Sequence, residues 1–179
     1  MERFLRFDAA LSQRFVLPLE SHWRRKARVM AHLGDGPYVF GGLGLAGLIG
    51  WLRSDFRFCQ NILVIAFIVL MTGLIVTLIK FIARRQRPQP PGEFVTFHYD
   101  VYSFPSGHSA RLAALAVAVL FWDPLWGAIL AVIAVGVAGA RVVVGVHYLT
   151  DIIMGLGVGG LVAWHGVTLL LPLLPVLSP

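Results

Sequence analysis

The strongest constraint on this chain is a series of five long apolar runs joined by mostly short polar links. The runs cover approximately Gly36–Leu52, Phe58–Ile79, Ser106–Trp122, Leu125–Val146 and Ile152–Leu171. A helix needs about 20 apolar residues to cross a bilayer, and each run approaches or reaches that length. The pattern therefore predicts an all-α fold: an integral membrane helical bundle with five transmembrane helices.

Composition supports this fold class and narrows the partners. Of the 179 residues, 58% are hydrophobic and 13% are charged, whereas a soluble domain carries about 25% charged residues. The net charge is +6, but the basic residues lie beside apolar runs and no nucleic-acid-binding motif accompanies them. The expected partners are anionic membrane lipid headgroups and phosphorylated substrates, not nucleic acid. The single cysteine, Cys59, excludes an intrachain disulfide and a multi-cysteine metal site.

The chain before the first run has a different character. It mixes charged and apolar residues and lacks the uninterrupted apolar core of a secretory signal peptide. We expect residues 1–35 to form an amphipathic segment, helical and interfacial, on the membrane surface. Residues 36–171 would then form the transmembrane domain.

The third apolar run begins inside a polar motif. Leu112–Trp122 alone has 11 residues, too few to cross a bilayer, so the helix is expected to begin near Ser106. Pro105 would then occupy the first helical position, where proline is favoured. The free N–H groups of that first turn would point toward an active face.

A basic cluster follows the second run. Lys80, Arg84 and Arg87 are spaced four and three residues apart, so a continued helix would place them on one face. Arginine donors match phosphate oxygens, and lysine adds a mobile positive charge. The simpler interpretation is a juxtamembrane cluster that binds only lipid headgroups.

A second motif, Pro105-Ser106-Gly107-His108, opens the third run. A hydroxyl, an unhindered glycine amide and a helix N-terminus together form an anion site. His108 could then donate a proton to a leaving oxygen. The simpler interpretation is an N-cap serine beside a surface histidine.

A third motif joins the last two runs. His147 and Asp151 are one helical turn apart, so the carboxylate can hold the imidazole in one tautomer while the histidine attacks phosphorus. Arg141 lies six residues before His147, on a different helix face, and Gly145 would let the chain turn between them. The alternatives are a capping aspartate near a snorkelling histidine, or half of a metal site. Metal is disfavoured because the chain has only nine acidic residues, few of them on this face.

Chain topology brings the three motifs together. With five spans, the loops 80–104 and 141–151 and the N-terminus fall on the same side of the membrane. Unpaired cations beside hydrocarbon are costly, so cations found there typically serve a ligand or a reaction. The combined motifs therefore predict a phosphate-binding site with two histidines at the membrane edge.

The three motifs resemble those of the type 2 phosphatidic acid phosphatase (PAP2) superfamily of membrane lipid phosphatases. In order, they are Lys80-x6-Arg87-Pro88, Pro105-Ser106-Gly107-His108 and Arg141-x5-His147-x3-Asp151. The resemblance covers roughly residues 58–165. It departs from the family at Ala140, where serine is usual, and the charged N-terminus replaces the first of the six membrane helices that the family core often has.

This resemblance implies a role for each site residue. The catalytic residues would be His147 as nucleophile, Asp151 as its orienting carboxylate and His108 as general acid. The phosphate oxygens would be bound by Lys80, Arg87, Ser106, Gly107 and Arg141. The resemblance also implies that no metal and no other cofactor is needed.

The implied activity is hydrolysis of a lipid phosphate monoester or diphosphate through a phosphohistidine intermediate. The substrate would be of the phosphatidic acid, phosphatidylglycerophosphate or polyisoprenyl diphosphate type, and the stretch from Arg84 to Pro105 looks like the polyisoprenyl diphosphate branch. The alternative is a catalytically inactive lipid-binding or transport membrane protein with the same fold. Intact His108, His147 and Asp151 favour the enzyme.

Membrane orientation receives opposite indications. All lysines and arginines except Arg53 and Arg57 lie on the active-face side, which by the positive-inside rule favours a cytoplasmic site. However, phosphate binding accounts for part of this charge, and most bacterial members of the family that the motifs resemble act outside the cytoplasm. We expect a multi-pass cell-membrane protein with an extracytoplasmic active site.

Overall fold

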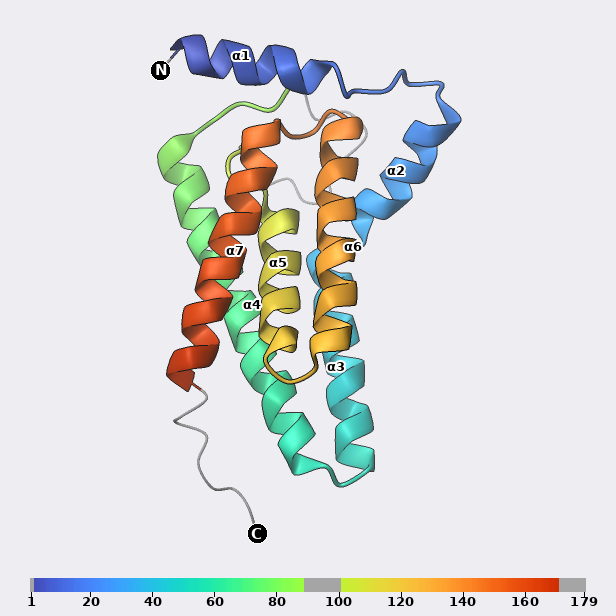
Figure 1. Ribbon diagram of the computed structural model, residues 1–179, viewed down its shortest axis with the longest axis vertical. Helices are drawn as coiled ribbons and strands as arrows, with labels where there is room; N and C mark the ends of the chain where they lie inside the picture. Colours follow the sequence, from blue (N-terminus) through green and yellow to red (C-terminus); the bar gives the residue numbers. More distant parts are fainter. Residues whose placement is uncertain (1, 89–100, 171–179) are drawn as a thin grey trace.

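The computed structural model describes residues 2–88 and 101–170, and this part of the chain is helical with no β-strand (Figure 1). Its helices are α1 (Glu2–Gln13), α2 (His22–His32), α3 (Gly36–Leu52), α4 (Phe56–Ala83), α5 (Gly107–Leu120), α6 (Pro124–Val143) and α7 (Leu149–Leu170). The predicted all-α fold is confirmed. Each predicted apolar run corresponds to one helix from α3 to α7.

The five apolar helices differ in length. In the described part of the chain, α4, α6 and α7 have 28, 20 and 22 residues and are long and apolar enough to cross a membrane. The other two, α3 and α5, have 17 and 14 residues. The bundle thus combines three helices of full spanning length with two shorter apolar helices.

The short helix α5 lies at the centre of the bundle, against α4, α6 and α7 (Figure 1). Its contact surface is made of small side chains, and Ala110, Ala114 and Ala118 are fully buried. On α7, Gly155 and Gly159 face α5, and a Cβ atom on Gly159 would lie 2.0 Å from the carbonyl oxygen of Ala110. Small residues permit this close approach between membrane helices, so α5 is held tightly along its length.

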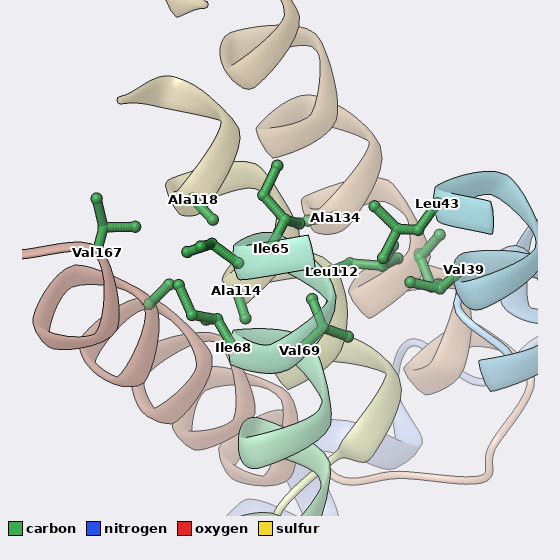
Figure 2. Packing of buried hydrophobic residues seen from close by; sticks show 13 residues of the cluster. Val39, Leu43, Ile65, Ile68, Val69, Leu112, Ala114, Ala118, Ala134 and Val167 are labelled. Atoms are coloured by element: carbon green, nitrogen blue, oxygen red, sulfur yellow. The ribbon is translucent and has the colours of Figure 1, made fainter. Parts of the chain in front are cut away.

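The apolar core joins α5 to α3, α4, α6 and α7 (Figure 2). In one buried cluster, Ile65, Ile68 and Val69 of α4 pack with Ala114 of α5 and Val167 of α7. Large apolar side chains also cover the outer surfaces of the long helices, among them Leu63, Ile82, Val132 and Leu161. A helix that is apolar on all sides is typical of a membrane bundle.

The helix α1 lies across the end of the bundle where α4 and α6 end and α7 begins (Figure 1). Polar side chains attach it: Asp8 and Ser12 are buried, and the hydroxyl of Ser12 accepts a hydrogen bond from the backbone N–H of Leu149 at 2.9 Å. Phe4 and Phe7 are 59% and 65% exposed. The helix therefore faces the bundle with polar groups and exposes aromatic ones.

The helix α2 packs against α6. Its Arg24 is buried and donates a hydrogen bond to the carbonyl oxygen of Val144 at 2.9 Å, just after α6 ends. The same guanidinium donates to the carbonyl oxygen of Leu17, in the link between α1 and α2. One arginine thus fastens the N-terminal helices to the end of α6.

The predicted continuation of the second run as a helix is wrong. The helix α4 ends at Ala83, and Arg84 adopts a left-handed backbone with φ 49°. Its side chain turns back and donates to the carbonyl oxygen of Phe81 at 3.0 Å. Because the chain leaves the helix here, Lys80 and Arg87 do not share a helical face with Arg84.

The predicted helical position of Pro105 is also wrong. Ser106 is the N-cap of α5, and its hydroxyl accepts a bond from the backbone N–H of Ser109 at 3.5 Å. The first helical residue is Gly107, so Pro105 lies one residue before the cap. The serine oxygen supplies the partner that the first turn needs, which moves the helix start past the proline.

Candidate active site

The predicted site residues come from four places at one end of the bundle. Lys80 lies in the last turn of α4, Arg141 in the last turn of α6, His108 in the first turn of α5 and Asp151 in the first turn of α7. Most of the predicted site residues are buried. The exposed fraction is 7% for Lys80, 0% for Ser106, 5% for His108, 1% for Arg141, 1% for His147 and 0% for Asp151. Isolated buried charges are strongly unfavourable, so this cluster of buried polar groups indicates a functional site.

A tight turn between α6 and α7 positions the third motif. Gly145 has φ 84°, a left-handed conformation that favours glycine. The backbone N–H of Val146 donates to the carbonyl oxygen of Arg141 at 3.1 Å, which closes the turn. The predicted turn at Gly145 is confirmed, and it brings His147 to the start of α7.

His147 and Asp151 lie next to each other and are fully buried. The Nδ1 atom of His147 is 3.4 Å from Oδ2 of Asp151, within ion-pair distance but without the alignment of a hydrogen bond. The same Oδ2 accepts the backbone N–H of Tyr148 at 2.9 Å. Asp151 therefore caps the start of α7 and also lies beside the histidine. This geometry is compatible with both the capping and the orienting interpretation.

The imidazole of His147 is held as a neutral base. Burial lowers its pKa well below the usual value, and the positive charges of Arg141, Arg87 and Lys80, together with His108, lower it further. Neither ring nitrogen makes a hydrogen bond to any described residue. A neutral imidazole with an unused lone pair is a nucleophile at neutral pH.

Two of the cations are anchored through backbone carbonyl groups. The Nζ atom of Lys80 donates to the carbonyl oxygen of Tyr102 at 3.0 Å, and Nη1 of Arg87 donates to that of Val146 at 3.3 Å. Both of these acceptors are neutral carbonyl groups. Three cations around one histidine can hold the oxygens of a phosphate group.

The start of α5 adds hydrogen-bond groups to the same end. The hydroxyl of Ser106 accepts from the hydroxyl of Ser109 at 3.0 Å, and the backbone N–H of Ser106 donates to the carbonyl oxygen of Asp151 at 2.9 Å. This last bond ties α5 directly to the third motif. Gly107 follows as the first helical residue and is buried.

The sequence interpretation missed Arg85, a cation that contacts several residues at the site. Its guanidinium donates to Oδ1 of Asp151 at 2.8 Å and to Oδ2 of Asp8 at 2.6 Å. It also donates to the hydroxyl of Thr150 at 2.7 Å and stacks on the ring of Tyr148 at 3.9 Å. Its position inside the first motif was the available signal, but its acidic partners lie far away in the sequence.

The sequence interpretation also missed Asp35. This buried carboxylate bonds Nε2 of His108 through Oδ1, and it accepts from Nδ1 of His32 at 2.9 Å through Oδ2. His32, in the last turn of α2, thus shares this carboxylate with His108. No local pattern connects Asp35 to a histidine 73 residues later.

Metal ligands do not gather in the described ranges 2–88 and 101–170. No group of three or more histidine, cysteine, aspartate or glutamate residues there could hold a metal ion. The residues that converge are mainly cations and histidines, a set suited to an anion.

Comparison with known proteins supplies the family. A sequence model described as the PAP2 superfamily matches residues 61–173, more than half of the chain. The chain belongs to the PAP2 superfamily. The three motifs that suggested this membership lie inside the matched range.

Individual PAP2 relatives match shorter stretches. The lipid A 1-phosphatase of Rhizobium etli is 32% identical over 99 residues, which are 51% of this chain and 43% of the relative. The undecaprenyl-diphosphatase of Sulfolobus acidocaldarius is 42% identical over 67 residues, 37% of this chain and 32% of the relative. The matched stretches thus span about two fifths or less of these curated relatives.

Solved PAP2 structures share the whole fold. A transmembrane PAP2 type phosphatidylglycerolphosphate phosphatase from Bacillus subtilis superimposes with a TM-score of 0.74 at 24% identity, covering 94% of this chain and 87% of that one. Aquifex aeolicus LpxE superimposes with a TM-score of 0.70 at 20% identity, covering 89% and 93%. The fold of this chain is therefore that of membrane PAP2 proteins.

Proposed function

We propose that this protein is a metal-independent membrane lipid phosphatase. It hydrolyses a phosphate monoester or diphosphate of a lipid through a phosphohistidine intermediate. One observation carries the proposal: neutral, buried His147 faces Asp151 and lies within the electrostatic influence of Lys80, Arg87 and Arg141. The PAP2 membership and the lipid phosphatases among its relatives support the same activity.

The first step forms the covalent intermediate. The phosphate group binds with its oxygens toward Lys80, Arg87 and Arg141, assisted by the Ser106 hydroxyl and the Gly107 amide. The lone pair of Nε2 of His147 attacks phosphorus in line with the leaving oxygen, and the phosphorus–oxygen bond to the lipid breaks. Fixed cations in a dry site stabilise the charge that develops on the phosphoryl oxygens.

Proton transfer completes both halves of the reaction. His108 donates a proton to the leaving oxygen, so the lipid departs as an alcohol or, from a diphosphate, as a monophosphate. A water molecule then attacks the phosphohistidine and returns a proton to His108, and the nitrogen–phosphorus bond breaks to release phosphate. Asp151 stabilises the positive imidazole of His147 while it carries the phosphoryl group.

The substrate is a lipid of the phosphatidic acid, phosphatidylglycerophosphate or polyisoprenyl diphosphate type. The relatives include a lipid A 1-phosphatase and an undecaprenyl-diphosphatase, which are monophosphate and diphosphate chemistries on different lipids. The headgroup is therefore the quantity that a substrate panel has to measure.

The same proposal includes a membrane arrangement. All five helices from α3 to α7 span the bilayer. The short α5 begins inside the site, at its N-cap Ser106. Residues 1–35 lie on the membrane surface, where the exposed Phe4 and Phe7 of α1 face lipid. The site is extracytoplasmic in a multi-pass protein of the cell membrane.

The test measures phosphate release from a panel of lipids in detergent micelles. The panel contains phosphatidic acid, phosphatidylglycerophosphate, undecaprenyl diphosphate and a phosphorylated lipid A. Wild-type protein should release phosphate from at least one of them, and His147→Ala should not. The control is His165→Ala, because His165 lies exposed on α7 and its ring bonds the carbonyl oxygen of Leu161 in the same helix.

Two results would contradict this function. The first is a folded wild-type protein that binds these lipids without releasing phosphate from any of them, which would favour a binding protein. The second is a His147→Ala variant that turns over like wild type.

A further inference from the structure

The carboxylate of Asp35 makes unusual contacts for an aspartate at a helix start. It is the N-cap residue of α3, yet its side chain makes no capping hydrogen bond. Asp55 and Asp123 hold the same position before α4 and α6, and both cap their helices. Asp55 accepts from the N–H of Phe58 at 2.9 Å, for example.

Instead of capping α3, Asp35 bonds two histidines. Its Oδ1 pairs with Nε2 of His108, and its Oδ2 accepts from Nδ1 of His32 at 2.9 Å. Asp35 is 5% exposed, and the side chains of His108 and His32 are 6% and 37% exposed. The carboxylate thus bonds the buried histidine of the site on one side and a partly exposed histidine on the other.

The loop that carries Asp35 is fitted against α5. A Cβ atom on Gly34 would lie 3.0 Å from Cβ and 3.1 Å from Cδ2 of His108, tighter than ordinary side-chain contacts. Arg111, one turn along α5, donates to the carbonyl oxygen of Gly34 from Nε at 3.3 Å and from Nη2 at 3.1 Å. Glycine at 34 lets the loop come close enough for the next residue to reach the imidazole.

Asp35 is ionised at neutral pH in this setting. Burial by itself raises the pKa of its carboxyl, but the hydrogen bonds from His108 and His32 outweigh burial and the pKa lies below its usual value. A carboxylate bonded to one imidazole nitrogen fixes the ring orientation and tautomer and stabilises the protonated ring.

We propose that Asp35 is the positioning residue of the general acid: it holds Nε2–H of His108 so that Nδ1 exchanges the proton with the leaving oxygen. The inference rests on the proposed phosphatase function and deepens it. Asp35 itself touches neither phosphate nor water in the reaction. The site then contains two histidine–aspartate pairs, one for the nucleophile and one for the acid.

A comparison of leaving groups separates positioning from structure. An alkoxide leaving group needs a proton, whereas 4-nitrophenolate departs with little help. In Asp35→Asn, kcat for dioleoyl phosphatidic acid should fall about 100-fold with little change in KM, while kcat for 4-nitrophenyl phosphate should fall less than about 5-fold. Asp35→Glu, which keeps the charge on a longer stem, should retain more activity than Asp35→Asn.

The control variant is Asp55→Asn, which keeps a capping residue at the equivalent place before α4 and should leave both rates unchanged. If Asp35→Asn does not fold, as judged by gel filtration, Asp35→Ser supplies a second N-cap residue for the same measurement. Equal losses on both substrates, or wild-type rates on both, would overturn the inference. Wild-type protein that releases phosphate from no substrate would instead contradict the proposed function.

Discussion

The two histidines of the site are each paired with an aspartate, but the pairs are built in different ways. His147 and Asp151 are four residues apart and belong to the turn that starts α7. His108 and Asp35 are 73 residues apart and join α5 to the loop before α3. The pair of the proposed nucleophile is therefore specified by a local turn, whereas the pair of the proposed acid exists only when the bundle is assembled.

This difference also separates the surroundings of the two pairs. Asp151 has a second strong partner in Arg85, which in turn binds Asp8 of α1. Asp35 has His32 as its second partner, at the end of α2. Each of these histidines is thus connected, through its aspartate, to one of the two N-terminal helices.

The largest effect that sharpens the comparison is expected at Asp151. Asp151→Asn keeps an oxygen for the N–H of Tyr148 but loses the charge that faces His147. We expect kcat to fall about 1,000-fold, more than the 100-fold expected at Asp35, because the nucleophile becomes cationic in the intermediate. Parallel kcat measurements on the two variants check the order, and a larger loss at Asp35 would reverse our ranking of the pairs.

A second prediction concerns charge and pH around the nucleophile. The lowered pKa of His147 keeps the ring neutral at and below its usual pKa of about 6.5, so wild-type kcat should not fall between pH 7.5 and pH 6. Arg141→Gln removes the positive charge that lowers the pKa of His147 most. The pKa of His147 should then rise toward its usual value and move the acid-side loss of activity to higher pH.

The same Arg141→Gln variant should lower kcat/KM about 100-fold, since one phosphate-binding cation is lost. Arg53→Gln is the matched control, because Arg53 is exposed at the opposite end of the bundle. A pH profile in Arg141→Gln identical to that of wild type would mean that Arg141 does not act on the nucleophile.

A smaller effect is expected at Arg85. Arg85→Lys keeps the positive charge but cannot donate to Asp8, Thr150 and Asp151 together. We expect about a 10-fold lower kcat and less protection of α1 in hydrogen exchange. Arg84→Lys serves as the control, since the side chain of Arg84 is exposed. Unchanged exchange in α1 would show that Arg85 does not couple this helix to the site.

The smallest effect is expected at the cap of α5. Ser106→Ala removes the acceptor for Ser109, which should cost about 1 kcal/mol of stability. The variant should melt a few degrees lower in detergent and lose phosphate affinity modestly. The side chain of Ser106 bonds Ser109, whereas that of Asp35 bonds His108 and His32. Because the two side chains share no hydrogen-bond partner, Asp35→Asn and Ser106→Ala should act additively. Strong coupling between them would mean that the cap also orients the acid.

Much of this molecule could be predicted from local sequence. Apolar runs predicted the five helices of the bundle because their composition and length are properties of contiguous residues. The turn at Gly145 followed from a single glycine between a cation and a histidine. Span parity predicted that Lys80, Arg87 and Arg141 lie on the same side as His147. In the structure, the charges of all three act on His147.

The parts that could not be predicted depend on tertiary contacts. Asp35 looks like an ordinary N-cap in the sequence, and only the approach of Gly34 to His108 gives its carboxylate another partner. Asp8 looks like one polar residue of a surface helix, and its contact with Arg85 is set by where α1 crosses the bundle. The two wrong helix boundaries arose where a left-handed residue or a serine cap ended the regular pattern.

The most direct test of the central claim is to trap the covalent intermediate. Protein mixed with a lipid carrying a radiolabelled terminal phosphate is quenched within milliseconds in alkaline detergent, and the bound label is then exposed to acid. We predict label on the wild-type chain that is stable to alkali and released by acid, as expected of phosphohistidine, and none on His147→Ala. Steady phosphate release by wild-type protein with no trapped label, or equal label on His147→Ala, would contradict the account.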